Sequence, residues 1–209
     1  MGCIADASAA LAKQPLEQAR PLRPRAPLEP ERVVRIAIHA LDALAVLHAR
    51  GTIHRDLKSA NIFIEAGTDR VRLLDLGFAK VTDEHAVTDP EQLLGTPLYI
   101  SPEQCFDPRQ VDARADLFSL GVAMFENLTG TWPYVWTSKR DLLRKVMTGE
   151  MERRPAAKRS EVPAWLDDIV ARSLALDREK RFANATEMRA ALERGARPQR
   201  PSLLKRLLR

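Results

Sequence analysis

Cysteine is scarce in this chain, which holds only Cys3 and Cys105. The two residues lie far apart and show no C-x-x-C spacing, so the sequence indicates neither a disulfide framework nor a zinc site. We therefore expect two free thiols in a reducing compartment.

Long hydrophobic runs are also missing. The most apolar stretch, residues 36–49, is interrupted by His39, Asp42 and His48 and is too short to span a bilayer. The N-terminus lacks the basic start and the continuous apolar core of a signal peptide. The sequence therefore predicts no transmembrane segment and a cytoplasmic protein.

The formal net charge is +5, and this excess of positive charge is confined to one end of the chain. Residues 193–209 carry six basic side chains and a single glutamate, so residues 1–192 are neutral on balance. No basic face is indicated for the body of the protein, and we expect no nucleic-acid partner.

The first thirty residues differ from the rest of the chain. Residues 1–30 contain five prolines from Pro15 onward and show no clear period, so we expect an irregular segment with at most a short helix over residues 7–20. From Glu31 the apolar residues fall on one helical face until Gly51, a natural C-terminal stop.

The remaining elements are predicted from short-range patterns. Residues 62–65 and 71–74 are two β-rich runs around a turn, which predicts a hairpin. Residues 112–129 are apolar almost all round, as in a buried central helix. Three further helical runs follow. Ser138 and Asn184 head two of them as capping residues, and Pro163 stands in the first turn of the third, over residues 163–175.

A group of chemically active side chains surrounds the predicted hairpin. His54-Arg-Asp-Leu-Lys-Ser-Ala-Asn61 precedes it, and Asp75-Leu-Gly77 follows it directly. Phosphoryl transfer needs an acceptor hydroxyl in line and cations that spread the phosphate charge. A carboxylate at Asp56 can orient and deprotonate the hydroxyl, and Lys58 can neutralise the γ-phosphate. Asn61 and Asp75, which the hairpin brings together, offer the oxygen ligands that Mg²⁺ prefers.

These segments resemble the catalytic loop and the Asp-x-Gly motif of the protein kinase family, with Leu76 in place of the usual phenylalanine. Residues 95–103 are similar to the P+1 loop and the Ala-Pro-Glu motif, with Ser101 replacing alanine. Residues 116–121 resemble the start of the family's central helix. The resemblance covers residues 31–194. Any one of these residues alone has an ordinary explanation as a cap or turn residue.

The resemblance implies a fold and a reaction. The fold is the C-terminal lobe of a protein kinase, mainly α-helical with small β-hairpins (α+β), over residues 31–194. An irregular segment, residues 1–30, precedes it and a basic tail, residues 195–209, follows. The implied reaction transfers the ATP γ-phosphate to Ser or Thr hydroxyls of a protein substrate, with Mg²⁺ as cofactor.

The resemblance also implies individual roles. Asp56 is the catalytic base and Lys58 the cation that positions the phosphate, while Asn61 and Asp75 bind Mg²⁺ and nucleotide.

Structural roles of four residues follow in the same way. His54 packs under the Asp-x-Gly turn, and Asp116 holds the catalytic-loop backbone. Glu103 forms an ion pair with Arg181.

The activation segment carries further expectations from the resemblance. Lys58 and Thr96 are typical of the serine/threonine branch. Arg55 indicates that a phosphate can order the segment, because a guanidinium binds a phosphate bidentately. Thr82 and Thr88 are the candidate acceptors.

The family's ATP-covering lobe has no counterpart in the sequence before Gly51. Only Gly2 precedes that residue, so no G-x-G-x-x-G loop exists, and no β-pattern surrounds Lys13. We expect the lobe to be missing, to be supplied by a separate N-terminal lobe or partner protein, or to be encoded upstream of an incorrect gene start.

Without that lobe, an apolar surface that includes Ile62, Phe63 and Leu74 is expected to face water, because residues 1–30 have few large apolar side chains to cover it.

Two classes of function remain open. The intact Asp56, Lys58, Asn61 and Asp75 favour a serine/threonine kinase. The missing glycine loop and lysine–glutamate pair favour a truncated, non-catalytic kinase-like module that docks partners through its peptide groove.

Overall fold

The computed structural model describes residues 19–22, 26–65, 69–74 and 97–197. These residues form three strands, seven α-helices and three short 3₁₀ helices. In chain order they are β1 (Ala19–Pro21), α2 (Pro30–His48), η2 (Ser59–Asn61), β2 (Ile62–Glu65), β3 (Val71–Leu73), α3 (Pro102–Phe106), η5 (Pro108–Gln110), α4 (Arg114–Thr129), α5 (Lys139–Thr148), α6 (Pro155–Lys158), α7 (Ala164–Ser173), η6 (Arg178–Lys180) and α8 (Ala185–Ala196).

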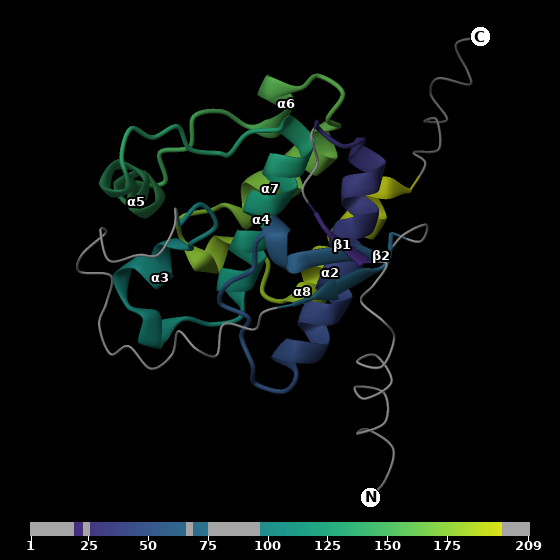
Figure 1. Ribbon diagram of the computed structural model, residues 1–209, viewed down its shortest axis with the longest axis horizontal. Coiled ribbons are helices and arrows are strands. Elements are labelled where there is room, and N and C mark those ends of the chain that lie inside the picture. The colour runs from purple at the N-terminus through teal and green to yellow at the C-terminus, as the bar shows by residue number, and fades with distance from the viewer. Residues whose placement is uncertain (1–18, 23–25, 66–68, 75–96, 198–209) are drawn as a thin grey trace, which may run out of the picture.

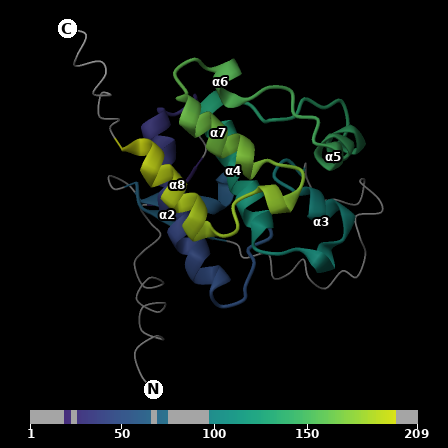
Figure 2. The ribbon, with the colours of Figure 1, turned by 180° about the vertical axis from the view of Figure 1, so that it is seen from behind.

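Helix α4 forms the centre of the molecule. Figure 1 shows it between α2 and α8 on one side and α3 and α5 on the other, and Figure 2 shows the same order from behind. Its side chains are buried all round, and Phe118, Phe125 and Leu128 are 0% exposed. The sequence predicted this helix because a helix that is apolar on every face must be enclosed.

A glycine sets the distance between α4 and α7. A Cβ atom at Gly121 would lie 2.1 Å from the Ser173 hydroxyl oxygen, so only a hydrogen side chain lets the two helices cross this closely. Gly130 ends α4 in the left-handed conformation, at φ 72°, where glycine is the favoured residue.

The predicted hairpin and most predicted helix starts are confirmed. Strands β2 and β3 pair antiparallel, with Ile62 opposite Leu73. Ser138 and Asn184 cap α5 and α8, each accepting a backbone N–H three residues further on. Pro163 differs slightly from expectation, since it is the N-cap residue of α7 and lies just before its first turn. No helix in the described part of the chain is long and apolar enough to cross a membrane.

The chain before α2 holds regular structure that the sequence analysis did not predict. Strand β1 pairs antiparallel with β2, with Pro21 opposite Phe63. The Leu22 N–H donates to the Ile62 carbonyl at 2.7 Å. Proline fits here because β1 is an edge strand, where one missing N–H is tolerated.

This strand corrects the expectation of an uncovered apolar surface. Leu22 is 6% exposed and Ile62 only 1%, so Ile62 belongs to the core, while Phe63 and Leu74 are partly buried. Leu22 and the three paired residues of β1 therefore cover part of the apolar surface that the sequence analysis expected to face water. Next along the chain, the Leu28 N–H donates to Asn127 of α4, and Arg159 donates to the Leu28 carbonyl.

The free cysteine within the described residues is Cys105. Burial, and then the nearby Glu103 carboxylate, raise the pKa of its thiol to about 12. The thiolate is the reactive form, so this buried side chain is chemically inert near neutral pH.

We expect Leu22→Ala to lower the free energy of unfolding by about 2–4 kcal/mol, because it removes a buried side chain and leaves a cavity beside Ile62. Chemical denaturation measures the change. Leu176→Ala is the matched control, since Leu176 is 43% exposed and should matter little. Equal effects of the two variants would show that Leu22 does not pack into the core.

Candidate active site

The loop between α2 and β2 carries three of the predicted catalytic side chains, and the structure brings them together. Lys58 Nζ lies 2.8 Å from Asp56 Oδ2. Asn61 Nδ2 donates to the Asp56 carbonyl at 2.8 Å and approaches Asp56 Oδ2 at 3.4 Å. The side chains of Lys58 and Asp56 are 37% and 23% exposed, so the carboxylate remains accessible from solvent.

The end of the hairpin is fixed beside this loop. The Leu74 N–H donates to the Asn61 carbonyl at 3.0 Å, and His54 Nε2 lies 3.1 Å from the Leu74 carbonyl oxygen. His54 is 0% exposed, which agrees with a packing role. Asp75 is the next residue after Leu74, but it lies outside the described residues, as do Leu76, Thr82, Thr88 and Thr96.

Arg55, directly before Asp56, has an unusual backbone conformation. Its φ is 64°, in the left-handed region that non-glycine residues rarely adopt. Such a conformation costs about 1–3 kcal/mol and persists only when its surroundings enforce it. Asp116 of α4 supplies part of that enforcement: its Oδ1 accepts the Arg55 N–H and its Oδ2 the His54 N–H, both at 2.9 Å.

The carbonyl group of Arg55 is held by Gln104, a residue that the sequence analysis did not single out. Gln104 Nε2 donates to the Arg55 carbonyl at 2.9 Å, while its Oε1 accepts the Ser101 N–H at the start of α3. A capping-box pattern, Ser101-x-x-Gln104, was present in the sequence and could have indicated the second contact. No pattern could have indicated the first.

Glu103 and Arg181 meet as expected. Two guanidinium nitrogens of Arg181 donate to the two carboxylate oxygens of Glu103 at 2.7 and 2.9 Å. The Arg181 side chain is 0% exposed, also donates to the carbonyls of Ala175, Arg114 and Leu176, and lies over the Phe118 ring. This buried cation is therefore fully hydrogen-bonded, and α3 is tied to the segment before α8.

A second polar cluster beside the loop was also missed. The Glu126 carboxylate on α4 accepts hydrogen bonds from the Ser59 hydroxyl and, at 2.6 Å, from the Tyr99 hydroxyl. Burial, and then the hydrogen bond to Glu126, raise the pKa of Tyr99 to about 12. Asn127 donates to the Ser59 hydroxyl at 3.2 Å. The cluster joins the catalytic loop to the segment that leads into α3.

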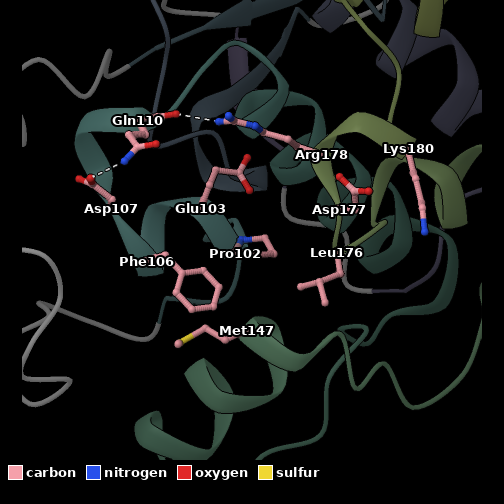
Figure 3. Close-up of a pocket in the computed structure, with 10 residues that line it drawn as sticks. All are labelled: Pro102, Glu103, Phe106, Asp107, Gln110, Met147, Leu176, Asp177, Arg178 and Lys180. Atoms are coloured by element: carbon pink, nitrogen blue, oxygen red, sulfur yellow. Dashed lines mark hydrogen bonds between the residues drawn. The ribbon is translucent and has the colours of Figure 1, made fainter.

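A groove of about 510 Å³ is lined by none of the three catalytic-loop residues Asp56, Lys58 and Asn61. It is bounded by α3, α5 and the segment 176–180, and Figure 3 shows Phe106 and Met147 facing each other across it. Of the predicted site residues in the described part of the chain, Glu103 alone lines it. The groove is therefore not where Asp56 would act.

No group of three or more His, Cys, Asp or Glu side chains is arranged to hold a metal ion within the described residues. Asparagine is not one of these four residue types, so Asn61 is considered separately. Its two hydrogen bonds to Asp56 are both donated by Nδ2. Its Oδ1 is the atom that suits a hard cation.

Comparison with known proteins gives consistent matches. The family model described as the protein kinase domain matches residues 12–192. Serine/threonine-protein kinase PknB of Mycobacterium leprae is 37% identical over 182 residues, which cover 85% of this chain and 29% of the relative. Serine/threonine-protein kinase Pkn1 of Myxococcus xanthus is 36% identical over 173 residues, or 80% of this chain and 24% of the relative. The chain thus spans less than a third of the length of these relatives.

Two solved structures share the fold. The Mycobacterium tuberculosis PknI kinase domain superposes with a TM-score of 0.59 at 25% identity, covering 82% of this chain and 58% of that one. Rad53 1–466 in complex with AMP-PNP gives a TM-score of 0.63 at 23% identity, covering 78% of this chain and 40% of that one. The mainly helical architecture with a small antiparallel sheet is that of a kinase C-terminal lobe.

We expect Arg181→Ala to lower the free energy of unfolding by about 3–5 kcal/mol, because it leaves Glu103 partly buried without its cation. The melting midpoint measures this loss. Arg144→Ala is the matched control: Arg144 also pairs with two carboxylates but is 51% exposed, so its variant should melt almost as the parent does. An unchanged midpoint for Arg181→Ala would contradict a structural role for the pair.

Proposed function

The chain belongs to the protein kinase family, and from that membership we propose that it transfers the ATP γ-phosphate to a Ser or Thr hydroxyl of a protein substrate. The observation that carries the proposal is the Asp56 carboxylate, accessible from solvent and held by Lys58 and Asn61 on a loop that Asp116 fixes. Serine/threonine kinases among the relatives support the same acceptor class.

In this proposal Asp56 is the base. Its carboxylate orients the acceptor hydroxyl and takes the proton as the oxygen bonds to the γ-phosphorus and the bond to the ADP oxygen breaks. Lys58, whose Nζ lies 2.8 Å from Asp56 Oδ2, is proposed to neutralise the γ-phosphate. Neither residue forms a covalent intermediate, so geometry and charge supply the catalysis.

Asn61 and Asp75 are proposed to hold Mg²⁺ with the nucleotide. Asn61 fits this role because its amide nitrogen makes both of its hydrogen bonds to Asp56, which directs Oδ1 away from them. When bound, Mg²⁺ would neutralise negative charge on the phosphate oxygens. Arg55 is proposed to bind a phosphorylated activation segment, with Thr82, Thr88 and Thr96 as part of that segment.

A non-catalytic docking role is the second candidate. It is favoured by one feature of the sequence: these 209 residues contain no glycine-rich loop to cover the phosphates. The two candidates differ in whether Asp56 matters once an N-terminal lobe is supplied.

We expect the 209-residue chain by itself to bind Mg-ATP weakly, because the amides and the lysine that hold phosphates in the N-terminal lobe are not among its residues. Titration calorimetry measures the affinity. A micromolar dissociation constant would contradict this expectation and would mean that residues of this chain replace the glycine loop.

We expect phosphotransfer when an N-terminal lobe, for example that of a PknB relative, is supplied in cis or in trans. Asp56→Asn should then lower the rate by about 100-fold or more, the usual contribution of a general base. Asp168→Asn is the matched control, since this α7 carboxylate is 72% exposed and its ion-pair partner is Arg154, which is not a residue of the loop. Equal rates for Asp56→Asn and the parent would rule out the proposed base and favour the docking role.

A further inference from the structure

An asparagine is buried in α4, directly after Glu126. Asn127 is 2% exposed, and its Nδ2 donates to the Ala123 carbonyl at 2.6 Å and to the Ser59 hydroxyl oxygen at 3.2 Å. Its Oδ1 is buried and has no hydrogen-bond partner among the described residues. A buried polar atom without a partner is unfavourable, so core packing alone does not account for an asparagine at this position.

The surroundings of Asn127 do not offer a water-binding site that would satisfy Oδ1. Asn127 lines a cavity of about 10 Å³, and the other side chains that line this cavity are apolar, among them Leu22, Ile36 and Leu120. A buried water needs about two to four polar partners, which these side chains do not supply. The two hydrogen bonds that Nδ2 donates are therefore the interactions that favour an amide here.

The donors and acceptors around Ser59 have a fixed order. The Ala123 carbonyl only accepts hydrogen bonds, so the Asn127 amide must present Nδ2 on this side. Nδ2 also donates to Ser59, whose own proton is then directed to Oε2 of the Glu126 carboxylate. The Tyr99 hydroxyl donates to the same oxygen at 2.6 Å. These four contacts form a hydrogen-bond relay that runs from the Asn127 amide to the Tyr99 hydroxyl.

The relay joins two separate parts of the candidate site. Ser59, which is 3% exposed, follows Lys58 in the catalytic loop and begins η2, the turn that ends at Asn61. Tyr99 lies in the segment before α3, and Ser119 of α4 donates to its carbonyl at 2.8 Å. Both parts donate to one carboxylate oxygen, so their spacing depends on the position of that oxygen.

We propose that Ser59 and Asn127 are positioning residues: Asn127 turns the Ser59 hydroxyl toward Glu126, and the resulting bond sets the spacing between the catalytic loop and the segment that holds Tyr99. The consequence for catalysis rests on the proposed function, because it assumes that a protein substrate bound along this segment brings its hydroxyl to Asp56. The structural consequence does not.

Amide hydrogen exchange of the whole 209-residue chain tests the structural consequence on both sides of the relay. The Asn61 N–H donates to the Lys58 carbonyl at 2.9 Å, and the Ile100 N–H lies 3.4 Å from the Pro97 carbonyl oxygen. In Ser59→Ala both amides should exchange about tenfold faster or more, as expected for loss of a hydrogen bond to a charged group. Ser59→Thr keeps the hydroxyl and should stay within about threefold of the parent. Equal acceleration in the two variants would overturn the proposal.

Asn127→Leu separates positioning from packing, and it decides the question if Ser59→Ala does not fold. Leucine has a shape similar to that of asparagine, the adjacent cavity accepts part of its extra volume, and the unpartnered Oδ1 is removed. The melting midpoint should therefore equal or exceed that of the parent, whereas the Asn61 and Ile100 amides should exchange about threefold faster or more. Unchanged exchange would overturn the proposal, because the amide would not then act on Ser59.

A double variant tests whether the two residues act through one relay. In the proposal Asn127 acts through Ser59, so Ser59→Ala combined with Asn127→Leu should accelerate exchange no more than Ser59→Ala alone. Multiplication of the two single effects would contradict a shared relay.

Thr129→Val is the matched control for Asn127→Leu. The Thr129 hydroxyl also donates to the carbonyl four residues back on α4, and its other contacts are with Thr131, outside the catalytic loop. This variant should leave the Asn61 and Ile100 amides unchanged. Acceleration equal to that in Asn127→Leu would show that the relay is not the cause.

The consequence for catalysis is measured with an N-terminal lobe supplied. Ser59→Ala should raise KM for a peptide substrate about tenfold and leave KM for Mg-ATP within about threefold, and Ser59→Thr should restore the parent values. An equal rise in both KM values would overturn the link to substrate positioning. Absence of phosphotransfer in the parent would count against the proposed function alone, since the exchange results do not depend on it.

Discussion

The carboxylate of Asp116 is the point on which the geometry of the candidate site depends. It is 1% exposed within α4, a helix that is buried on almost every face, where an ionised group without donors would be strongly unfavourable. Three N–H groups satisfy it, one from the ring of His48 and two from the backbone amides of His54 and Arg55. The need to satisfy a buried charge and the need to fix a strained loop are thus met by the same hydrogen bonds.

Helix α4 extends this support along one side. Ser119 donates to the Tyr99 carbonyl at 2.8 Å, Glu126 accepts from Tyr99 and Ser59, and Asn127 donates to Ser59. These polar side chains follow Asp116 at roughly helical spacing, so they line a face that the catalytic loop and the segment before α3 both contact. A single rigid helix therefore positions two loops relative to each other, which is how a site built on loops keeps its geometry.

Charge burial also holds the lobe together further from Asp56. The buried Arg181 guanidinium donates hydrogen bonds to Glu103 and to three backbone carbonyls. Its burial is tolerated because every donor has an acceptor. Exposed pairs such as Arg144 with Asp141 and Glu150 lack that enclosure and contribute little. The apolar groove of Figure 3 lies beside the Arg181 connection, where α3 meets the segment 176–180.

The amino-acid sequence by itself determined the family, the ranges of the main helices, the hairpin and the pairing of Glu103 with Arg181. Periodicity and capping are local, and the spacing of the kinase motifs is specific, so both could be read without a structure. Only the tertiary structure decided that Leu22 covers Ile62, that Gln104 holds the Arg55 carbonyl, and that His48 meets Asp116. These partners lie 40 to 68 positions apart. Their contacts arise because packed helices and strands bring unrelated segments together, and such contacts leave no periodic pattern in the sequence.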